Sequence, residues 1–127
     1  MRNIVYYLGL TALFVHEMDA VMAAEWRLLY VLRTLPAATA YTAFLLLHLP
    51  MFFLLLWLSH HGNARLRDGF RLLASGFLVV HAGLHARLAG AALNDFDGLV
   101  SNALIAAAGL FGAAYLLLWV RDRRSAA

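Results

Sequence analysis

The chain has 127 residues, of which 64% are hydrophobic, and its mean hydropathy of +0.75 exceeds that of ordinary soluble domains. It contains no cysteine, which excludes disulfides, thiolate nucleophiles and cysteine-based metal sites, so any metal must be held by His, Asp or Glu. The net charge of +3 comes from arginines placed between apolar runs, a pattern that indicates membrane topology and argues against nucleic-acid binding.

An apolar segment at residues 4–24 predicts a first transmembrane helix, because about 20 residues are needed to cross a hydrocarbon core of about 30 Å. Its second half carries His16, Glu17 and Asp19, at a depth where charge is unfavourable and an ionisable residue suggests function. Arg2 followed by a short apolar run is also typical of a signal peptide, but these three side chains are unusual just before a cleavage site. We therefore interpret the segment as a membrane helix.

Residues 37–58 predict a second span, which carries His48 near its middle. The preceding connector, residues 25–36, has aromatic side chains of the kind that lie at the level of the lipid headgroups. A polar loop at residues 59–68 follows this span and contains two adjacent histidines, at positions 60 and 61. We interpret these two as ordinary loop histidines.

Residues 70–93 and 99–120 predict the third and fourth spans. The third span carries His81 and His85, and the link at 94–98 turns the chain into the fourth. The expected fold is therefore an all-α integral membrane protein, a bundle of four transmembrane helices that forms a single domain over residues 1–127. It would be a multi-pass protein with the lipid bilayer as its surroundings.

The arginines predict the orientation of this bundle, because cytoplasmic loops are enriched in them. Seven lie on the side of the two termini: Arg2, Arg65, Arg67, Arg71, Arg121, Arg123 and Arg124. Only Arg27 and Arg33 lie on the other side. Both termini should therefore be cytoplasmic, and the 94–98 link, with its two aspartates, should be external.

Histidines from three of these helices are expected at one depth. With a rise of about 1.5 Å per residue, His16, His81 and His85 lie roughly 16–22 Å from the cytoplasmic ends of their helices. His48 lies about 16 Å from the outer end of the second helix. Residues three or four positions apart share a helix face, which pairs His81 with His85. The same rule pairs His16 with Asp19.

Imidazole and carboxylate groups are ligands of zinc, non-haem iron and manganese, and facing helices of a bundle commonly hold such metals. We therefore predict a divalent metal site in the outer half of the bundle, with the candidate ligands His16, Asp19, His48, His81 and His85. Glu17 points about 100° away from His16 and is a candidate acid or base catalyst. Glu25 can join only if the chain bends after Ala24. A metalloenzyme with this site would hydrolyse or oxidise a lipid or other apolar molecule that enters sideways.

Three alternatives remain open at this point. The first is an electron-transfer protein in which two of the histidines are axial ligands of a haem. The polar groups can instead form a hydrogen-bonded core, for example Asp19 or Glu17 with Arg87. A small proton-coupled carrier could use the same buried groups.

Glycines recur every seven residues along the third span, at Gly76, Gly83 and Gly90, on the face opposite His81 and His85. Small residues let helix backbones approach closely. This stripe predicts a homodimer through the third helix, although packing within the chain is the other interpretation, as it is for the small residues of the fourth span.

The segment His16-Glu17-Met18-Asp19-Ala20, followed by Glu25-Trp26-Arg27, resembles a motif of small, uncharacterised bacterial membrane proteins with four helices. The resemblance extends weakly over the whole length, and only these first residues are distinctive. It implies a bacterial inner-membrane location and a shared polar site. Because that family has no assigned activity, the resemblance adds no reaction.

Overall fold

The computed structural model describes residues 1–96 and 98–125, which form an all-α structure. Its long helices are α1 (Arg2–Met22), α2 (Ala37–Ser59), α3 (Ala64–Leu88) and α4 (Leu99–Arg124), with two short 3₁₀ turns, η1 (Glu25–Arg27) and η2 (Leu32–Thr34), between the first two. All four helices are long and apolar enough to cross a membrane. This confirms the expected all-α class with four candidate spans. Asp97 of the predicted 94–98 link lies outside the described residues.

The bounds of the third helix differ most from those expected, since α3 begins six residues before the predicted 70–93 segment and ends five residues before its end. It begins early because the Asn63 side chain accepts hydrogen bonds from the backbone N–H groups of Arg65 (2.9 Å) and Leu66 (3.3 Å), which caps the helix. The second half of the predicted polar loop therefore forms the first turn of α3. After Leu88 the chain leaves the helix, and Gly90 has a φ of +82°.

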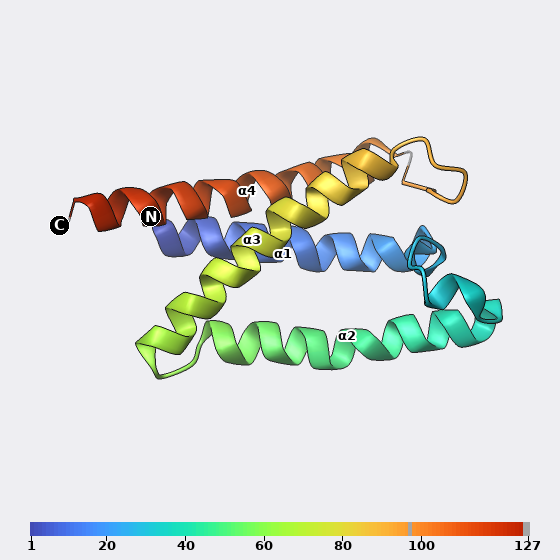
Figure 1. The fold of residues 1–127 in the computed structure, drawn as a ribbon, viewed down its shortest axis with the longest axis horizontal. Coiled ribbons are helices and arrows are strands. Elements are labelled where there is room, and N and C mark those ends of the chain that lie inside the picture. The colour runs from blue at the N-terminus through green and yellow to red at the C-terminus, as the bar shows by residue number, and fades with distance from the viewer. Residues whose placement is uncertain (97, 126–127) are drawn as a thin grey trace.

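The helices α1, α3 and α4 pack closely, whereas α2 stands apart and contacts mainly α3 and the 3₁₀ turns (Figure 1). Glycines of α4 allow the close crossing with α3. A Cβ atom added to Gly109 would lie 2.6 Å from the Cβ of Ala82, and one on Gly112 would lie 2.7 Å from the carbonyl oxygen of Ser75. Only glycine fits at these two positions without a shift of the helices.

The glycines of α3 behave differently. A Cβ atom on Gly76 or Gly83 would meet no atom within 4 Å, so packing within the chain does not use them. Gly90 lies beyond the end of α3 and leaves the predicted stripe with two helical members. The expectation that all three share one helix face is therefore wrong for Gly90, because the helix ends before it.

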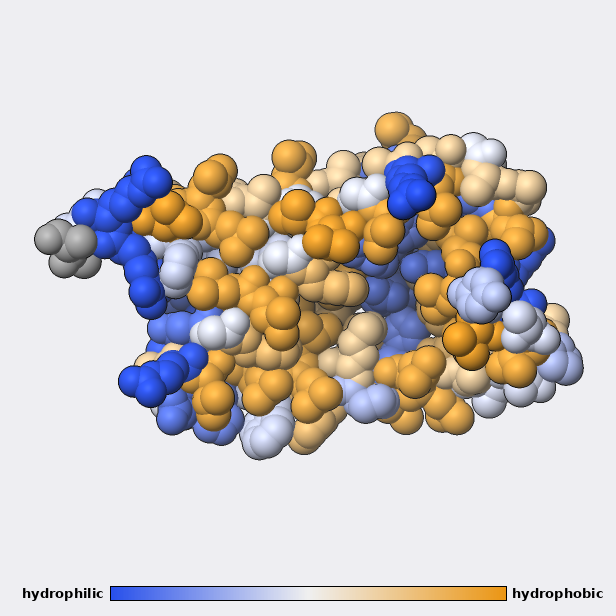
Figure 2. Space-filling model, in the orientation of Figure 1, coloured by the Kyte–Doolittle hydropathy of each residue, from blue (hydrophilic) through white to orange (hydrophobic). Residues whose placement is uncertain are grey.

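Two apolar clusters form the interior. One contains Tyr6, Leu10, Leu13, Leu55, Ala74, Leu78, Ala108 and Tyr115, and the other contains Ala20, Leu32, Ala40, Phe44, Phe96 and Ile105. Along α1, the first cluster ends at Leu13 and the second begins at Ala20, and His16 lies between them. The polar residues are thus held between two packed apolar regions. Figure 2 shows hydrophilic surface at the ends of the molecule and a recessed hydrophilic area between apolar helices.

Candidate metal centre

Four side chains from three elements converge at one point: His16 of α1, Glu25 of η1, and His81 and His85 of α3. One ligand atom of each lies within 4.8 Å of all the others. The Nε2 atoms of His16 and His81 are 3.0 Å apart. The Glu25 carboxyl oxygens lie 3.7 Å from His16 Nε2 and 3.6 Å from His85 Nε2. We call this group the His₃Glu cluster.

The backbone after α1 brings Glu25 into the cluster. The helix ends at Met22, Ala24 adopts a left-handed conformation with φ 50° and ψ 44°, and η1 begins at Glu25. This turn folds the chain back toward α1 and buries Glu25, which is 8% exposed. A left-handed conformation costs about 1 kcal/mol or more in a residue with a Cβ atom. The bend after Ala24 that Glu25 needs in order to join the site therefore exists, although no glycine marks it.

The three imidazoles come together through helical spacing and the crossing of α1 with α3. His81 and His85 are one turn apart on α3, with ring centroids 4.7 Å apart. The His16 ring lies 5.1 Å from the first and 4.9 Å from the second. His16 is fully buried, His85 is 8% exposed, and His81 is partly exposed. The predicted common depth of these three histidines is thus matched by contact between their rings.

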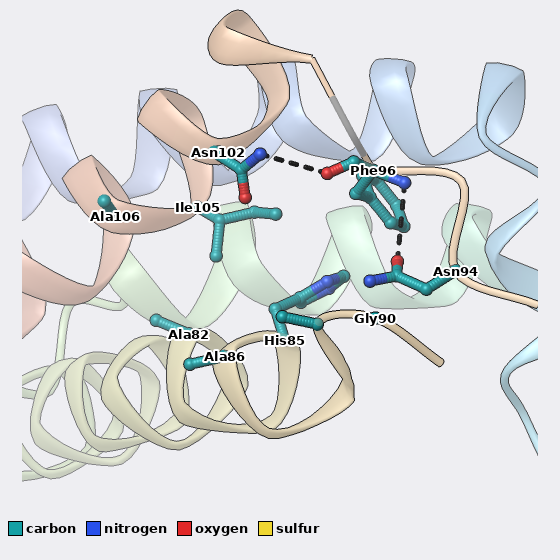
Figure 3. Close-up of a pocket in the computed structure, with 10 residues that line it drawn as sticks. Ala82, His85, Ala86, Gly90, Asn94, Phe96, Asn102, Ile105 and Ala106 are labelled. Carbon is teal, nitrogen blue, oxygen red and sulfur yellow. Dashed lines mark hydrogen bonds between the residues drawn. The ribbon is translucent and has the colours of Figure 1, made fainter. Parts of the chain in front are cut away.

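The link after α3 covers the cluster. The Phe96 ring is 4% exposed and packs 4.7 Å from the His85 ring and 5.4 Å from the His16 ring. Asn102 of α4 donates a hydrogen bond to the carbonyl oxygen of Phe96 at 3.0 Å (Figure 3) and another to that of Gly98, also at 3.0 Å. The sequence predicts this link only as a turn and does not predict its role as a cover. A single aromatic residue in a polar link was the available signal.

His48 and Glu17 form a separate pair. His48 Nδ1 donates to the Phe44 carbonyl oxygen at 2.7 Å, and its Nε2 lies 3.0 Å from Glu17 Oε2. Because a carbonyl can only accept, Nδ1 carries a proton, so one further proton must lie between Nε2 and the carboxyl. The pair is therefore either imidazolium with carboxylate or imidazole with carboxylic acid, and its net charge is zero in both forms.

Asp19 also lies outside the His₃Glu cluster. Its Oδ2 atom is buried and has no hydrogen-bond partner among the described residues. Arg87 is exposed and makes no side-chain hydrogen bond or ion pair with any of the described residues. Its expected pairing with Asp19 or Glu17 is therefore not formed. Of the five ligands expected from the sequence, three meet, two do not, and Glu25 completes the group.

The electrostatics of the cluster favour an ionised carboxylate. Burial raises the pKa of Glu25, but the imidazoles of His85, His81 and His16 lower it by more, so this pKa lies below its ordinary value. Three buried atoms of the cluster have no hydrogen-bond partner among the described residues: Glu25 Oε2, His16 Nδ1 and His85 Nδ1. A buried carboxylate oxygen without a donor is unfavourable unless a cation lies against it.

The spacing of the donor atoms fits a small cation. In a tetrahedral site with metal–nitrogen distances of about 2.0–2.1 Å, neighbouring ligand atoms lie about 3.3 Å apart. The separations of 3.0, 3.6 and 3.7 Å within the cluster are close to that value. A haem places its two axial ligands on opposite faces of a macrocycle, which the 3.0 Å separation of His16 and His81 does not accommodate.

A cavity of about 490 Å³ lies beside His85, between α3 and α4. Alanine lines much of its wall, and the amides of Asn94 and Asn102 supply polar groups (Figure 3). Its volume is in the range that holds small organic molecules. The cluster therefore has a mainly apolar space directly beside one of its ligands.

No curated protein and no solved structure matches this chain. A family model described as a family of unknown function, DUF6713, matches residues 2–122, from the start of α1 into the last turn of α4. The match therefore includes every residue of the His₃Glu cluster. The chain belongs to DUF6713, a family of unknown function.

Proposed function

We propose that this protein is a multi-pass membrane protein that binds a divalent metal ion through His16, Glu25, His81 and His85. The observation that carries the proposal is the buried Glu25 carboxylate, which has an oxygen without a hydrogen-bond donor and faces three imidazoles. Three imidazoles and a carboxylate suit zinc, iron or manganese. Asp19 and His48 are not part of the proposed ligand set.

The proposed activity is that of a metalloenzyme, a hydrolase or an oxidase. A divalent ion at this position would supply Lewis acidity, or redox chemistry if it is iron. The cavity beside His85 is mainly apolar and lies between two helices that can face lipid, which supports a lipid or another apolar molecule as the substrate. Asn94 and Asn102 are the groups that could orient a polar end of that molecule.

Glu17 remains the candidate acid or base catalyst in this proposal. It is 6% exposed and shares one proton with His48, so that proton can move between the carboxyl and the imidazole while the net charge of the pair stays at zero. Glu17 directly follows His16, one of the proposed metal ligands, in the sequence.

The orientation and assembly are also proposals. The start of α1 and the end of α4 lie at the same end of the molecule (Figure 1), where the surface is hydrophilic (Figure 2) and Arg2, Arg121 and Arg123 lie close together. This supports cytoplasmic termini and a metal centre in the outer half of a bacterial inner membrane. The outward position of Gly76 and Gly83 supports a homodimer through α3.

Elemental analysis and an absorption spectrum of the protein purified in detergent test the metal proposal. The parent chain should carry about one zinc, iron or manganese ion per chain. Glu25→Gln keeps the size of the side chain and removes its charge, and it should abolish metal binding. The single variants His81→Ala and His85→Ala should do the same. His61→Ala and His48→Ala are matched controls that remove an imidazole outside the cluster, and both should keep the ion.

Each other outcome identifies an alternative. A Soret band would indicate a haem, and absence of both metal and haem would indicate a hydrogen-bonded polar core or a proton carrier. Equal metal content in Glu25→Gln and His61→Ala would show that the cluster is not the metal site.

A further inference from the structure

Arg71 of α3 is a buried cation at the opposite end of the bundle from the 94–98 link. It is 7% exposed. Its Nε and Nη2 atoms donate to the Ser59 carbonyl oxygen at 3.0 and 2.7 Å, Nη2 also donates to the Tyr7 hydroxyl at 3.0 Å, and Nη1 donates to Asn3 Oδ1 at 3.1 Å. All three partners are neutral. Within residues 1–96 and 98–125, Arg71 forms no ion pair with a carboxylate.

Such a charge needs compensation, because a buried ion without a counter-charge is strongly unfavourable. Arginine side chains do not lose their proton in proteins, so deprotonation cannot remove the free-energy cost of burying this charge. The rings of Tyr6 and Tyr7, with centroids 5.2 and 5.5 Å from the guanidinium carbon, offset part of it. The environment of Arg71 therefore still favours an anion.

A polar pocket of about 450 Å³ opens beside this side chain. Its lining residues are Arg2, Asn3, His60, Arg67, Asp68 and Arg71, three guanidinium groups against one carboxylate. Arg67 pairs with Asp68 at 3.1 Å, and Arg2 pairs with Asp122 at 3.4 Å. Both pairs are partly exposed to solvent, where ion pairs contribute little, so an incoming anion can compete for these two arginines.

The guanidinium is held by hydrogen-bond partners on two other helices, α1 and α2. His60 Nδ1 donates to the Leu56 carbonyl oxygen at 2.8 Å, which leaves Nε2 of the neutral ring to accept from the Tyr7 hydroxyl at 2.9 Å. The Tyr7 oxygen in turn accepts from Arg71. The four hydrogen bonds that Arg71 makes leave one of its five N–H donors, on Nη1, without a partner. A ligand would thus meet a donor that is already oriented, which reduces the entropic cost of binding.

We propose that this pocket binds a phosphate group. Planar guanidinium forks match the geometry and charge of phosphate oxygens, and two or more arginines acting together are the usual arrangement for such a ligand. The pocket lies at the ends of α1, α2 and α3, where hydrophilic surface gathers beside the chain termini (Figures 1 and 2). At this level of a membrane the phosphate can belong to a lipid headgroup or to a free anion.

The site is independent of the metal centre. Arg71 precedes His81 on α3 by about 15 Å of helix rise, and the two groups share no residue. Metal content therefore serves as a readout of correct folding for variants of the phosphate pocket, and loss of metal in a Glu25→Gln variant should leave phosphate binding unchanged.

Arg67→Gln is the principal test, because it removes one cation of the pocket and leaves every hydrogen bond of Arg71 in place. Arg71→Lys, which keeps the charge and removes the fork, is the second variant. Arg124→Gln is the control, since it removes the same charge at the same end of the molecule and lies outside the pocket. Native mass spectrometry would count retained dioleoylphosphatidic acid against dioleoylglycerol, which lacks the phosphate. Calorimetry in a neutral detergent would measure inorganic phosphate.

We expect the parent chain to retain phosphatidic acid and not diacylglycerol if the source is a lipid, or to bind inorganic phosphate if the source is a free anion. In either case Arg67→Gln and Arg71→Lys should weaken binding by roughly tenfold or more, as expected for a lost charged hydrogen bond. Arg124→Gln should leave it unchanged. The proposal is overturned if neither phosphate probe binds, if diacylglycerol is retained equally well, or if the Arg67 and Arg124 variants lose binding to the same extent.

Discussion

The crossing of α3 and α4 should depend on Gly109, and a single methyl group tests this. In Gly109→Ala the new Cβ atom would lie 2.6 Å from the Cβ of Ala82, whereas carbon atoms in contact prefer about 3.5–4.0 Å. The helices must therefore separate locally by about 1 Å, and overpacking of this kind typically costs about 1–3 kcal/mol. Gly69→Ala is the matched control, because its Cβ atom would meet nothing within 4 Å.

Both variants gain the same helix preference of alanine over glycine, about 1 kcal/mol in water, so the difference between them isolates the packing cost. Reversible unfolding in mixed micelles, followed by circular dichroism, should show Gly109→Ala about 1–3 kcal/mol less stable than Gly69→Ala. Because Ala82 follows His81 directly, Gly109→Ala should also lower metal affinity. Equal stability of the two variants would refute the close crossing and the placement of His81 that depends on it.

Three further outcomes are expected. Because Ala24 has a positive φ, Ala24→Gly should stabilise the fold and keep the metal. Ala24→Val should destabilise the fold by about 1 kcal/mol or more in the same unfolding assay. Similar effects of the two changes would contradict the bend before Glu25. Gly83→Leu should weaken dimer association by about 1–2 kcal/mol and leave the metal content intact, which cross-linking in bilayers would measure. A parent chain that cross-links only as a monomer would exclude the dimer. A reporter fused after Ala127 should be cytoplasmic and one inserted at Ala92 external, and an internal signal at Ala92 would reverse the proposed topology.

Sequence alone determined the local features of this protein. Apolar length predicted four helices that can span a membrane, because the thickness of the hydrocarbon core sets the length of each run. Helical periodicity placed His81 and His85 on one face, and the rise per residue placed His16 near their depth. The earlier start of α3 is also encoded locally, in the cap at Asn63, although the arginines after it favour a loop.

The composition of the cluster was decided only by the tertiary structure. Glu25 reaches His16 only because the backbone at Ala24 is left-handed. A glycine at this position would have indicated such a conformation in the sequence, but an alanine does not. His48 pairs with Glu17, away from the other histidines, because α2 stands apart from the packed trio of α1, α3 and α4. A helix period fixes which side chains share a face, but the partner of that face is set by contacts between distant segments, such as Gly109 against Ala82. The burial of Arg71, which has no carboxylate partner among the described residues, has the same origin, since its hydrogen-bond partners come from two other helices, α1 and α2.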